Sequence, residues 1–217
     1  MPNAYHVPFF EAIKIRRSTV ALAKESPISD ERIVVIVNHA IKHAPSPFSV
    51  QSCRAIVLFG TDHEKMWDIG HTEMKKTMPA PVFANFVDKI AGYKAAYGTV
   101  LFFEDTKAVE KLPPPLQSVI GSHPEWYEHS NGMNQYIAWT ALCAEGLGCN
   151  LQHFNPQVNK AVAETWNVPE SWNLRAQLVF GKPTGPPRGG LQKAFAPLEG
   201  RVLVHGNGKE HIAPNGI

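Results

Sequence analysis

The stretch Glu145-Gly-Leu-Gly-Cys-Asn-Leu-Gln-His-Phe-Asn-Pro156 joins a long predicted helix to a short extended segment. Gly146 and Gly148 can end the helix, because glycine readily adopts the left-handed backbone that closes many helices. A dinucleotide-binding G-x-G-x-x-G fingerprint has the reverse order, in which a strand leads through the glycines into a helix. We therefore expect no Rossmann site here, and we expect residues 151–154 to be extended.

Outward from this stretch, apolar residues recur with helical and extended periods in turn. Ser29 can cap a helix that ends near residue 44, before Pro45 and Pro47. Helices are predicted at residues 9–18, 29–44, 61–76, 81–97, 126–147 and 155–166, and strands at 54–60, 99–103, 174–181 and 201–205. In the helix at 126–147, one face is expected to carry Met133, Ile137, Ala141 and Ala144. The pattern predicts an α+β fold, with a mixed β-sheet covered by helices, in a single domain over residues 1–217.

The composition limits the classes of function. The chain has 217 residues, 44% of them hydrophobic, and a net charge of only +2, which argues against a nucleic-acid or polybasic membrane surface. Its longest aliphatic run, residues 33–37, is far short of the ~20 residues that cross a bilayer, so we expect no membrane insertion. Three cysteines without a C-x-x-C pair, and an N-terminus without a secretory pattern, indicate a reducing compartment. We expect a cytoplasmic protein, or a nuclear one in a eukaryote.

The usual catalytic and metal-binding patterns are missing from the sequence. It contains no G-x-S-x-G and no G-x-x-x-x-G-K-[ST]. His39 and His43 are spaced for one face of a helix but have no third ligand nearby, so a solvated face is the better interpretation. The other paired histidines, His63 with His71 and His123 with His129, are expected at the surface. We predict no catalytic acid or base, no nucleophile and no metal.

A candidate anion site lies at the end of the first helix. The guanidinium groups of Arg16 and Arg17 and the hydroxyl of Ser18 could bind a phosphate through charge-assisted hydrogen bonds. Taken alone, Arg-Arg-Ser is a common solvated helix end. The segment from Pro45 to Gln51, about 30 residues on, is by itself only a turn.

Order and spacing together are more informative than each motif alone. The chain combines Arg16-Arg-Ser18, the Pro45-Ser-Pro-Phe-Ser-Val-Gln51 turn and the Glu145–Pro156 stretch. This set resembles the flavin-dependent nitroreductase family, and most of all its small fungal and bacterial members with Leu-Gln-His-[Tyr/Phe]-Asn-Pro, whose fungal members are linked to fatty-acid regulation. Residues 126–139, 169–176, 180–183 and 193–202 fit the same branch, so the resemblance covers residues 8–204.

The resemblance implies an intertwined homodimer with FMN at the subunit interface. Arg16, Arg17 and Ser18 would hold the FMN phosphate or ribityl chain, and Lys193 would add a second positive group. The partner's wall against the flavin would come from Pro45, Ser46, Pro47, Phe48, Ser49 and Gln51. Near the reactive edge of the ring would lie Gln152, His153 and Phe154. Such a protein would pass hydride from NAD(P)H through FMN to small aromatic acceptors, nitroaromatic or quinone-like, in a ping-pong cycle.

Two positions depart from relatives of this family. Ser49 stands where many have asparagine, and Val20 where some have a lysine that faces the pyrimidine edge of the flavin. Lys14 or Lys94 could replace that lysine. Two alternatives to an enzyme also remain open, namely a flavin-binding regulatory or lipid-response protein with little turnover and a flavin-free descendant.

Overall fold

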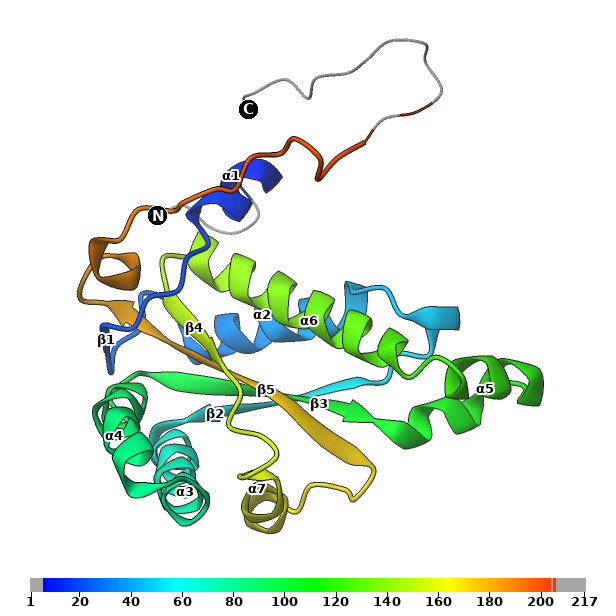
Figure 1. Ribbon diagram of the computed structural model, residues 1–217, viewed down its shortest axis with the longest axis horizontal. Helices are drawn as coiled ribbons and strands as arrows, with labels where there is room; N and C mark the ends of the chain where they lie inside the picture. Colours follow the sequence, from blue (N-terminus) through cyan, green and yellow to red (C-terminus); the bar gives the residue numbers. More distant parts are fainter. Residues whose placement is uncertain (1–5, 204, 206–217) are drawn as a thin grey trace.

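The computed structural model describes residues 6–203 and 205, and it arranges them around a five-stranded sheet (Figure 1). The strands are β1 (Leu22–Ala23), β2 (Cys53–Phe59), β3 (Gly98–Asp105), β4 (Gly148–Gln152) and β5 (Trp172–Pro183). The order across the sheet is β1-β5-β3-β2, and β4 also pairs with β5. These pairings are all antiparallel, so the expected mixture of directions is limited to one parallel bridge between Ser18 and Cys149.

Helices cover both faces of the sheet, which confirms the α+β class (Figure 1). One face lies under α2 (Asp30–His43) and α6 (Glu125–Ala144), and the other under α3 (Gly60–Thr77), α4 (Ala80–Lys94) and α7 (Asn159–Trp166). The short helix α1 (Phe9–Ile15) contacts α6, and α5 (Pro114–Gly121) packs on the 3-10 turn Thr106–Lys111. Further 3-10 turns are Pro47–Ser49 and Pro187–Gly190.

Strand β3 shows why the sheet needs helices on both sides. Its side chains alternate between the two faces, as in any strand. Val100 and Phe102 join the core under α2 and α6, whereas Leu101 and Phe103 join the core under α3, α4 and α7. All four residues are buried, so both faces must be covered.

The α2 prediction is confirmed in detail. The Ser29 hydroxyl accepts a hydrogen bond from the backbone N–H of Arg32 at 3.3 Å and caps the helix. Four apolar residues at helical spacing, Ile33, Ile36, Val37 and Ala40, are buried against the sheet. The helix ends at His43, before the prolines.

Several element predictions are wrong. Residues 201–203 form a turn and a bend rather than a strand, because Arg201 bonds locally to the carbonyls of Ala196 and Leu198; His205 lies outside any strand, and residue 204 is outside the described residues. The helix expected from residue 155 begins at Asn159. Strand β1 and helix α5 were not predicted. No helix in the described part of the chain has the length and apolar character needed to cross a membrane.

The face predicted for helix α6 is buried only in part. Ala144 is buried and Ile137 and Ala141 pack partly buried against the core, but Met133 is 38% exposed. Asn131, Asn134, Ala138 and Leu142 are buried as well. The Asn131 amide explains the difference, because its Nδ2 donates to the Phe103 carbonyl and to Glu104 Oε2, both at 3.0 Å. Buried polar side chains that are hydrogen-bonded can occupy a core face that a purely apolar pattern does not reveal.

Candidate functional site

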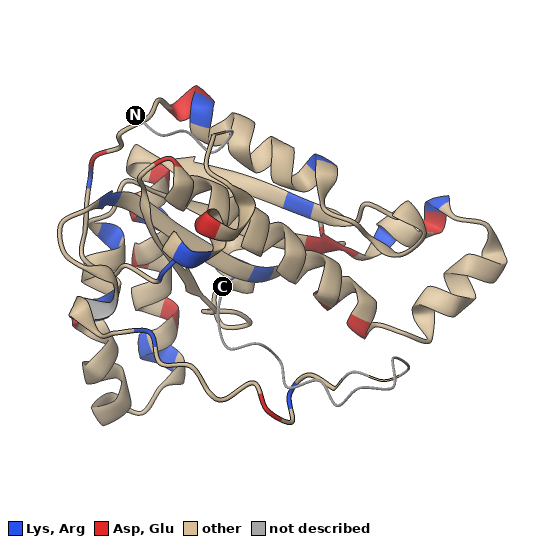
Figure 2. Ribbon diagram, turned by 90° about the horizontal axis from the view of Figure 1, so that it is seen from above, with Lys and Arg blue, Asp and Glu red and all other residues tan. Residues whose placement is uncertain are grey.

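The predicted cationic residues from the two ends of the chain meet at one cavity of about 340 Å³. Its lining residues are Arg16, Arg17, Ser18, Leu191, Gln192, Lys193 and Ala194. Among these described residues none is acidic, although Figure 2 shows basic and acidic residues interspersed over the rest of the ribbon. Three cations and a hydroxyl around one cavity can bind an anion such as a phosphate.

Local contacts fix the cationic groups. Arg17 Nη2 donates to the carbonyl of Leu191 at 2.8 Å, which ties the C-terminal segment to the end of α1. The Arg16 guanidinium lies 4.5 Å from the ring centre of Trp139 on α6. Because both arginines follow the C-terminal end of α1, the helix dipole contributes no positive potential, so the side chains alone supply the charge.

Strand β4 connects this cavity to the second predicted group. Next to Ser18, the Thr19 N–H donates to the Cys149 carbonyl at 2.8 Å, and Asn150 Nδ2 donates to the Thr19 carbonyl at 2.8 Å. Gln152 Nε2 in turn donates to Asn150 Oδ1 at 3.0 Å. At ~3.3 Å per residue, Gln152 lies ~10 Å along the strand from Cys149. Ser18 therefore lies beside one end of β4, and Gln152 lies at the other end of the same strand.

At the far end of β4, the three predicted residues have different environments. His153 is exposed and Gln152 is half-buried. Phe154 is only 3% exposed, with its ring 5.3 Å from that of Trp67 and its N–H bonded to Gln177 Oε1 at 2.7 Å. Phe154 was predicted to lie near the reactive edge of the flavin ring, and its own ring packs into the core under α3 and α4, where it is shielded from water.

The predicted turn from Pro45 to Gln51 lies away from the cationic cavity. Pro45, Ser46 and Pro47 line a second cavity of about 190 Å³, together with four residues of α6, namely Trp126, His129, Ser130 and Met133. The Phe48 ring is 6.2 Å from that of Trp126, and Ser49 and Gln51 are exposed. Since Trp126 and Trp139 are thirteen residues apart on α6, the turn and Arg16 lie ~20 Å apart along that helix. One chain does not bring them into one cavity.

The turn also carries unusual backbone. Phe48, Ser49 and Gln51 have φ of 48°, 54° and 50°, in the left-handed region that favours glycine. Nothing in the sequence signals this, because none of the three is glycine or asparagine. Such conformations persist only when their surroundings impose them, and they gather at functional sites.

The other sequence alternatives lie away from the cavity. Lys14 pairs with Glu11 at 2.9 Å on α1, and Lys94 pairs with Asp68 at 2.6 Å between α4 and α3. The described lining of the cavity includes neither lysine. The rings of His39 and His43 lie 4.3 Å apart on the exposed face of α2, and no described group of three or more His, Cys, Asp or Glu could hold a metal.

His63 is buried, although the sequence placed it at the surface. It is 0% exposed, with Nδ1 2.9 Å from Thr99 Oγ1, and Trp67 Nε1 donates to the same oxygen at 3.0 Å. Since burial disfavours the charged ring, the pKa of His63 falls to about 4. At neutral pH it is an uncharged part of the core.

A buried polar cluster behind the turn was also missed. Glu104 is 0% exposed, and burial raises its pKa despite the hydrogen bond from Asn131. Burial, followed by the nearby Glu104 charge, raises the pKa of the Cys53 thiol to about 12. Single polar residues at the ends of strands gave no sequence signal for this cluster.

Comparison with known proteins identifies the family. Residues 13–182 match the family described as the nitroreductase family. The chain belongs to the nitroreductase family. The protein HBN1 of Saccharomyces cerevisiae is 36% identical over 181 residues, 82% of this chain and 90% of its own, which supports the predicted fungal branch.

Solved structures agree with this membership. Nitroreductase CinD from Lactococcus lactis, in complex with nicotinic acid, has a TM-score of 0.81 at 35% identity and covers 92% of this chain and 100% of its own. The FMN-dependent nitroreductase NfnB from Mycobacterium smegmatis, in complex with NADPH, has a TM-score of 0.71 at 14% identity and covers 90% and 97%. The latter likeness concerns the fold alone.

Proposed function

We propose that this nitroreductase-family chain is an FMN-dependent enzyme that takes hydride from NAD(P)H and reduces nitroaromatic or quinone-like acceptors. The observation that carries the proposal is the cavity where Arg16, Arg17, Ser18 and Lys193 converge. A phosphate ester carries about −1.5 to −2 charges and needs several cationic donors to leave water, and this cavity offers three cations without a carboxylate in its described lining. The donor set therefore fits the FMN phosphate. When bound, FMN supplies the hydride-transfer chemistry, so the chain needs no nucleophile.

The rest of the cofactor would extend from the cavity along β4. Ser18 lies beside Cys149 at one end of this strand, and Gln152 and His153 lie ~10–13 Å further along it. An elongated ribityl phosphate directed this way would place its ring near the Gln152 amide and the exposed His153. These residues would orient the ring, and the Phe154 backbone would keep the strand end in place through Gln177.

A homodimer would complete the site. The turn from Pro45 to Gln51 lies ~20 Å from Arg16 along α6, so a second copy could bring its turn against the first chain's flavin. Exposed apolar side chains lie on both N- and C-terminal segments, including Phe9 at 68%, Leu191 at 66% and Phe195 at 76% exposure. A second copy of the chain would cover such exposed apolar side chains.

Small aromatic acceptors suit the second cavity. Trp126 and His129 contribute aromatic faces to it, and Met133 contributes an adaptable apolar one. CinD has been solved with chloramphenicol and with 4-nitrophenol, as well as with nicotinic acid. All three cysteines of this chain are free, which suits the reducing cytoplasm.

The absorbance spectrum of the purified protein tests the proposal. We expect bound FMN, rapid bleaching by anaerobic NADPH or NADH, and recovery of colour on adding 4-nitrophenol or a quinone. Sedimentation should show a dimer. Reduction over many minutes together with a stable protein partner would instead favour a regulatory role, and a colourless protein that does not take up added FMN would refute flavin binding.

A further inference from the structure

The turn from Pro45 to Gln51 is held by hydrogen bonds to the backbone of Gln51. Three exposed residues near this point, Phe48, Ser49 and Gln51, have positive φ, and their side chains are too exposed for packing to impose that backbone. Hydrogen bonds do so instead. The Gln51 N–H donates to Ser46 Oγ at 2.9 Å, and the Gln51 carbonyl accepts from Arg54 Nη1 at 2.6 Å.

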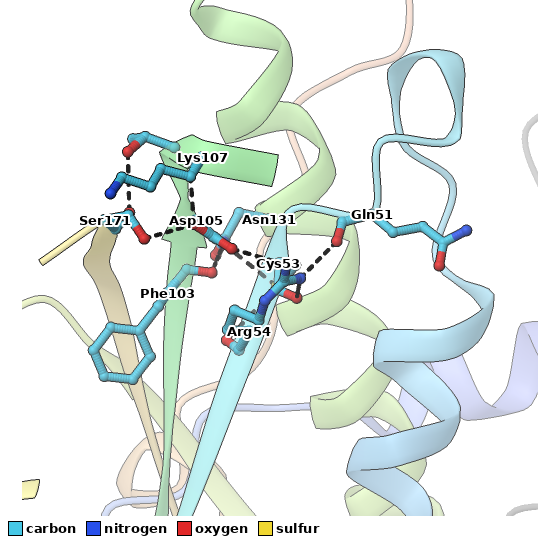
Figure 3. Close-up of polar contacts among 9 residues, drawn as sticks. Gln51, Cys53, Arg54, Phe103, Asp105, Lys107, Asn131 and Ser171 are labelled. Carbon is cyan, nitrogen blue, oxygen red and sulfur yellow. Dashed lines mark hydrogen bonds and ion pairs between the residues drawn. The ribbon is translucent and has the colours of Figure 1, made fainter. Parts of the chain in front are cut away.

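Arg54 connects the turn to the sheet (Figure 3). Its Nη1 donates to the carbonyls of Gln51 and Cys53, the latter at 3.0 Å, and its Nη2 donates to Asp105 Oδ2 at 2.9 Å. The guanidinium also lies 5.9 Å from the ring centre of Trp172. A planar fork of donors can satisfy these three acceptors together, whereas a lysine ammonium lacks that fixed geometry.

Asp105 makes the anchor rigid. Its Oδ1 accepts from Ser171 Oγ at 2.8 Å and from the Lys107 N–H at 3.1 Å (Figure 3). The Asp105 N–H donates to the Ser52 carbonyl at 2.9 Å. Asp105 therefore ties the end of β3 to the start of β5 while it orients Arg54. A continuous set of contacts runs from the sheet through Asp105 and Arg54 to the backbone of Gln51.

We propose that Arg54 is a positioning residue of the flavin site, which locks the backbone of Gln51 and so presents Phe48 and Ser49 in a fixed conformation to the flavin of the partner subunit. This inference rests on the proposed function. Arg54 itself points away from the exposed side of the turn, toward Asp105, and acts only through Gln51. Without it, the turn would relax from its left-handed backbone, because the Gln51 carbonyl would lose its charged donor.

The test compares Arg54→Met and Arg54→Lys with a matched control, Arg32→Met. Arg32 and Glu145 form a second ion pair, in which the arginine side chain is 25% exposed against 24% for Arg54. FMN titration of the apoproteins, followed by flavin fluorescence, should give a Kd about 10-fold higher for Arg54→Met, because a hydrogen bond to a charged donor is lost. Arg54→Lys should be intermediate. Arg32→Met should keep the wild-type Kd while losing comparable thermal stability.

A second measurement needs no flavin. Hydrogen exchange in apoprotein peptides covering residues 46–53 should be faster in Arg54→Met than in Arg32→Met. If Arg54→Met does not fold, Arg54→Lys and Asp105→Asn answer the same question. Wild-type Kd and wild-type exchange in the Arg54 variants would overturn the inference while leaving the proposed function intact. A wild-type protein that binds no FMN would instead refute the proposed function itself.

Discussion

The two faces of the sheet differ in the side chains that cover them. Under α3, α4 and α7, the core is aromatic and close-packed, with Trp67, Tyr93 and Phe154 in mutual contact. The face under α2 and α6 carries both candidate regions, since Arg16 lies over Trp139 and the Pro45 turn shares a cavity with Trp126. Stability and the proposed ligand contacts are thus divided between the faces, and substitutions on each should change different measured quantities.

The largest expected effect is on stability, from Trp67→Ala. Trp67 is 0% exposed and donates to Thr99 Oγ1, so its removal leaves a large cavity and takes away one of the two hydrogen-bond partners of that hydroxyl, the other being His63. We expect a loss of ~3–5 kcal/mol in the free energy of unfolding, measured on the apoprotein in urea. Tyr136→Ala, at a 37% exposed position of α6, is the control and should cost far less. Equal losses would contradict the division between the faces.

The same packed face should make stability depend on pH through His63. The pKa of His63 is lowered to about 4, from 6.5, so between these values the unfolded chain binds a proton that the folded chain does not. This contribution is fully present above about pH 6.5 and is lost as pH falls toward 4. At ~1.4 kcal/mol for each pH unit, the full loss is about 3 kcal/mol.

Comparison with His63→Gln isolates this contribution. The pKa of Glu104 is raised by burial, so its contribution to stability is lost as pH rises, opposite in sign to that of His63. Both proteins contain Glu104, and its effect cancels in the difference between them. Urea unfolding at pH 7 and pH 4.5 should show a steeper loss in wild type than in the variant, and parallel losses would exclude His63 as the cause.

On the other face, Arg16→Ala and Arg17→Ala should affect binding instead. Each removes a charge-assisted contact from the cavity, for which we expect a loss of ~1.5–3 kcal/mol in FMN binding, tenfold or more in Kd. Stability of the apoproteins should change by less than ~0.5 kcal/mol, because both side chains reach solvent. Lys14→Ala removes a nearby charge that is outside the cavity lining, and it should leave Kd unchanged at moderate salt. Unchanged flavin stoichiometry in both arginine variants would remove the phosphate assignment.

The sequence predicted features carried by periodicity or by a set of motifs. The cap at Ser29, the buried face of α2 and the residues that meet at the cationic cavity are of this kind. The sequence did not predict which single polar residues are buried. His63 and Asn131 are buried because each has partners on a neighbouring element, and a lone sequence position does not name those partners.

Tertiary context explains the remaining differences. Phe154 occurs within a family motif, but its ring turns into the core, so a motif position does not say which way a side chain points. Arg54 and Asp105 are separated by fifty-one positions and meet only because β2 and β3 pair. The positive φ at Phe48, Ser49 and Gln51 is imposed by this contact and by Ser46, against the intrinsic preference of the residues.

The smallest expected effect breaks the division between the faces, because at Ser49 stability and binding should change in opposite directions. Ser49 has φ of 54°, which glycine adopts without steric cost. The free energy of unfolding of Ser49→Gly should therefore be ~0.5 kcal/mol higher than that of the wild type. The relief of strain is partly offset by the greater freedom of glycine in the unfolded chain. FMN should nevertheless bind more weakly, because the freed turn no longer presents one conformation and the hydroxyl that accepts from Gln51 Nε2 is gone.

Ser49→Ala separates the two causes: it also removes the hydroxyl but keeps the strain, so it should show no gain in stability. If glycine and alanine give the same unfolding free energy, the left-handed backbone at this position carries no strain, and the turn is held by its hydrogen bonds at no conformational cost.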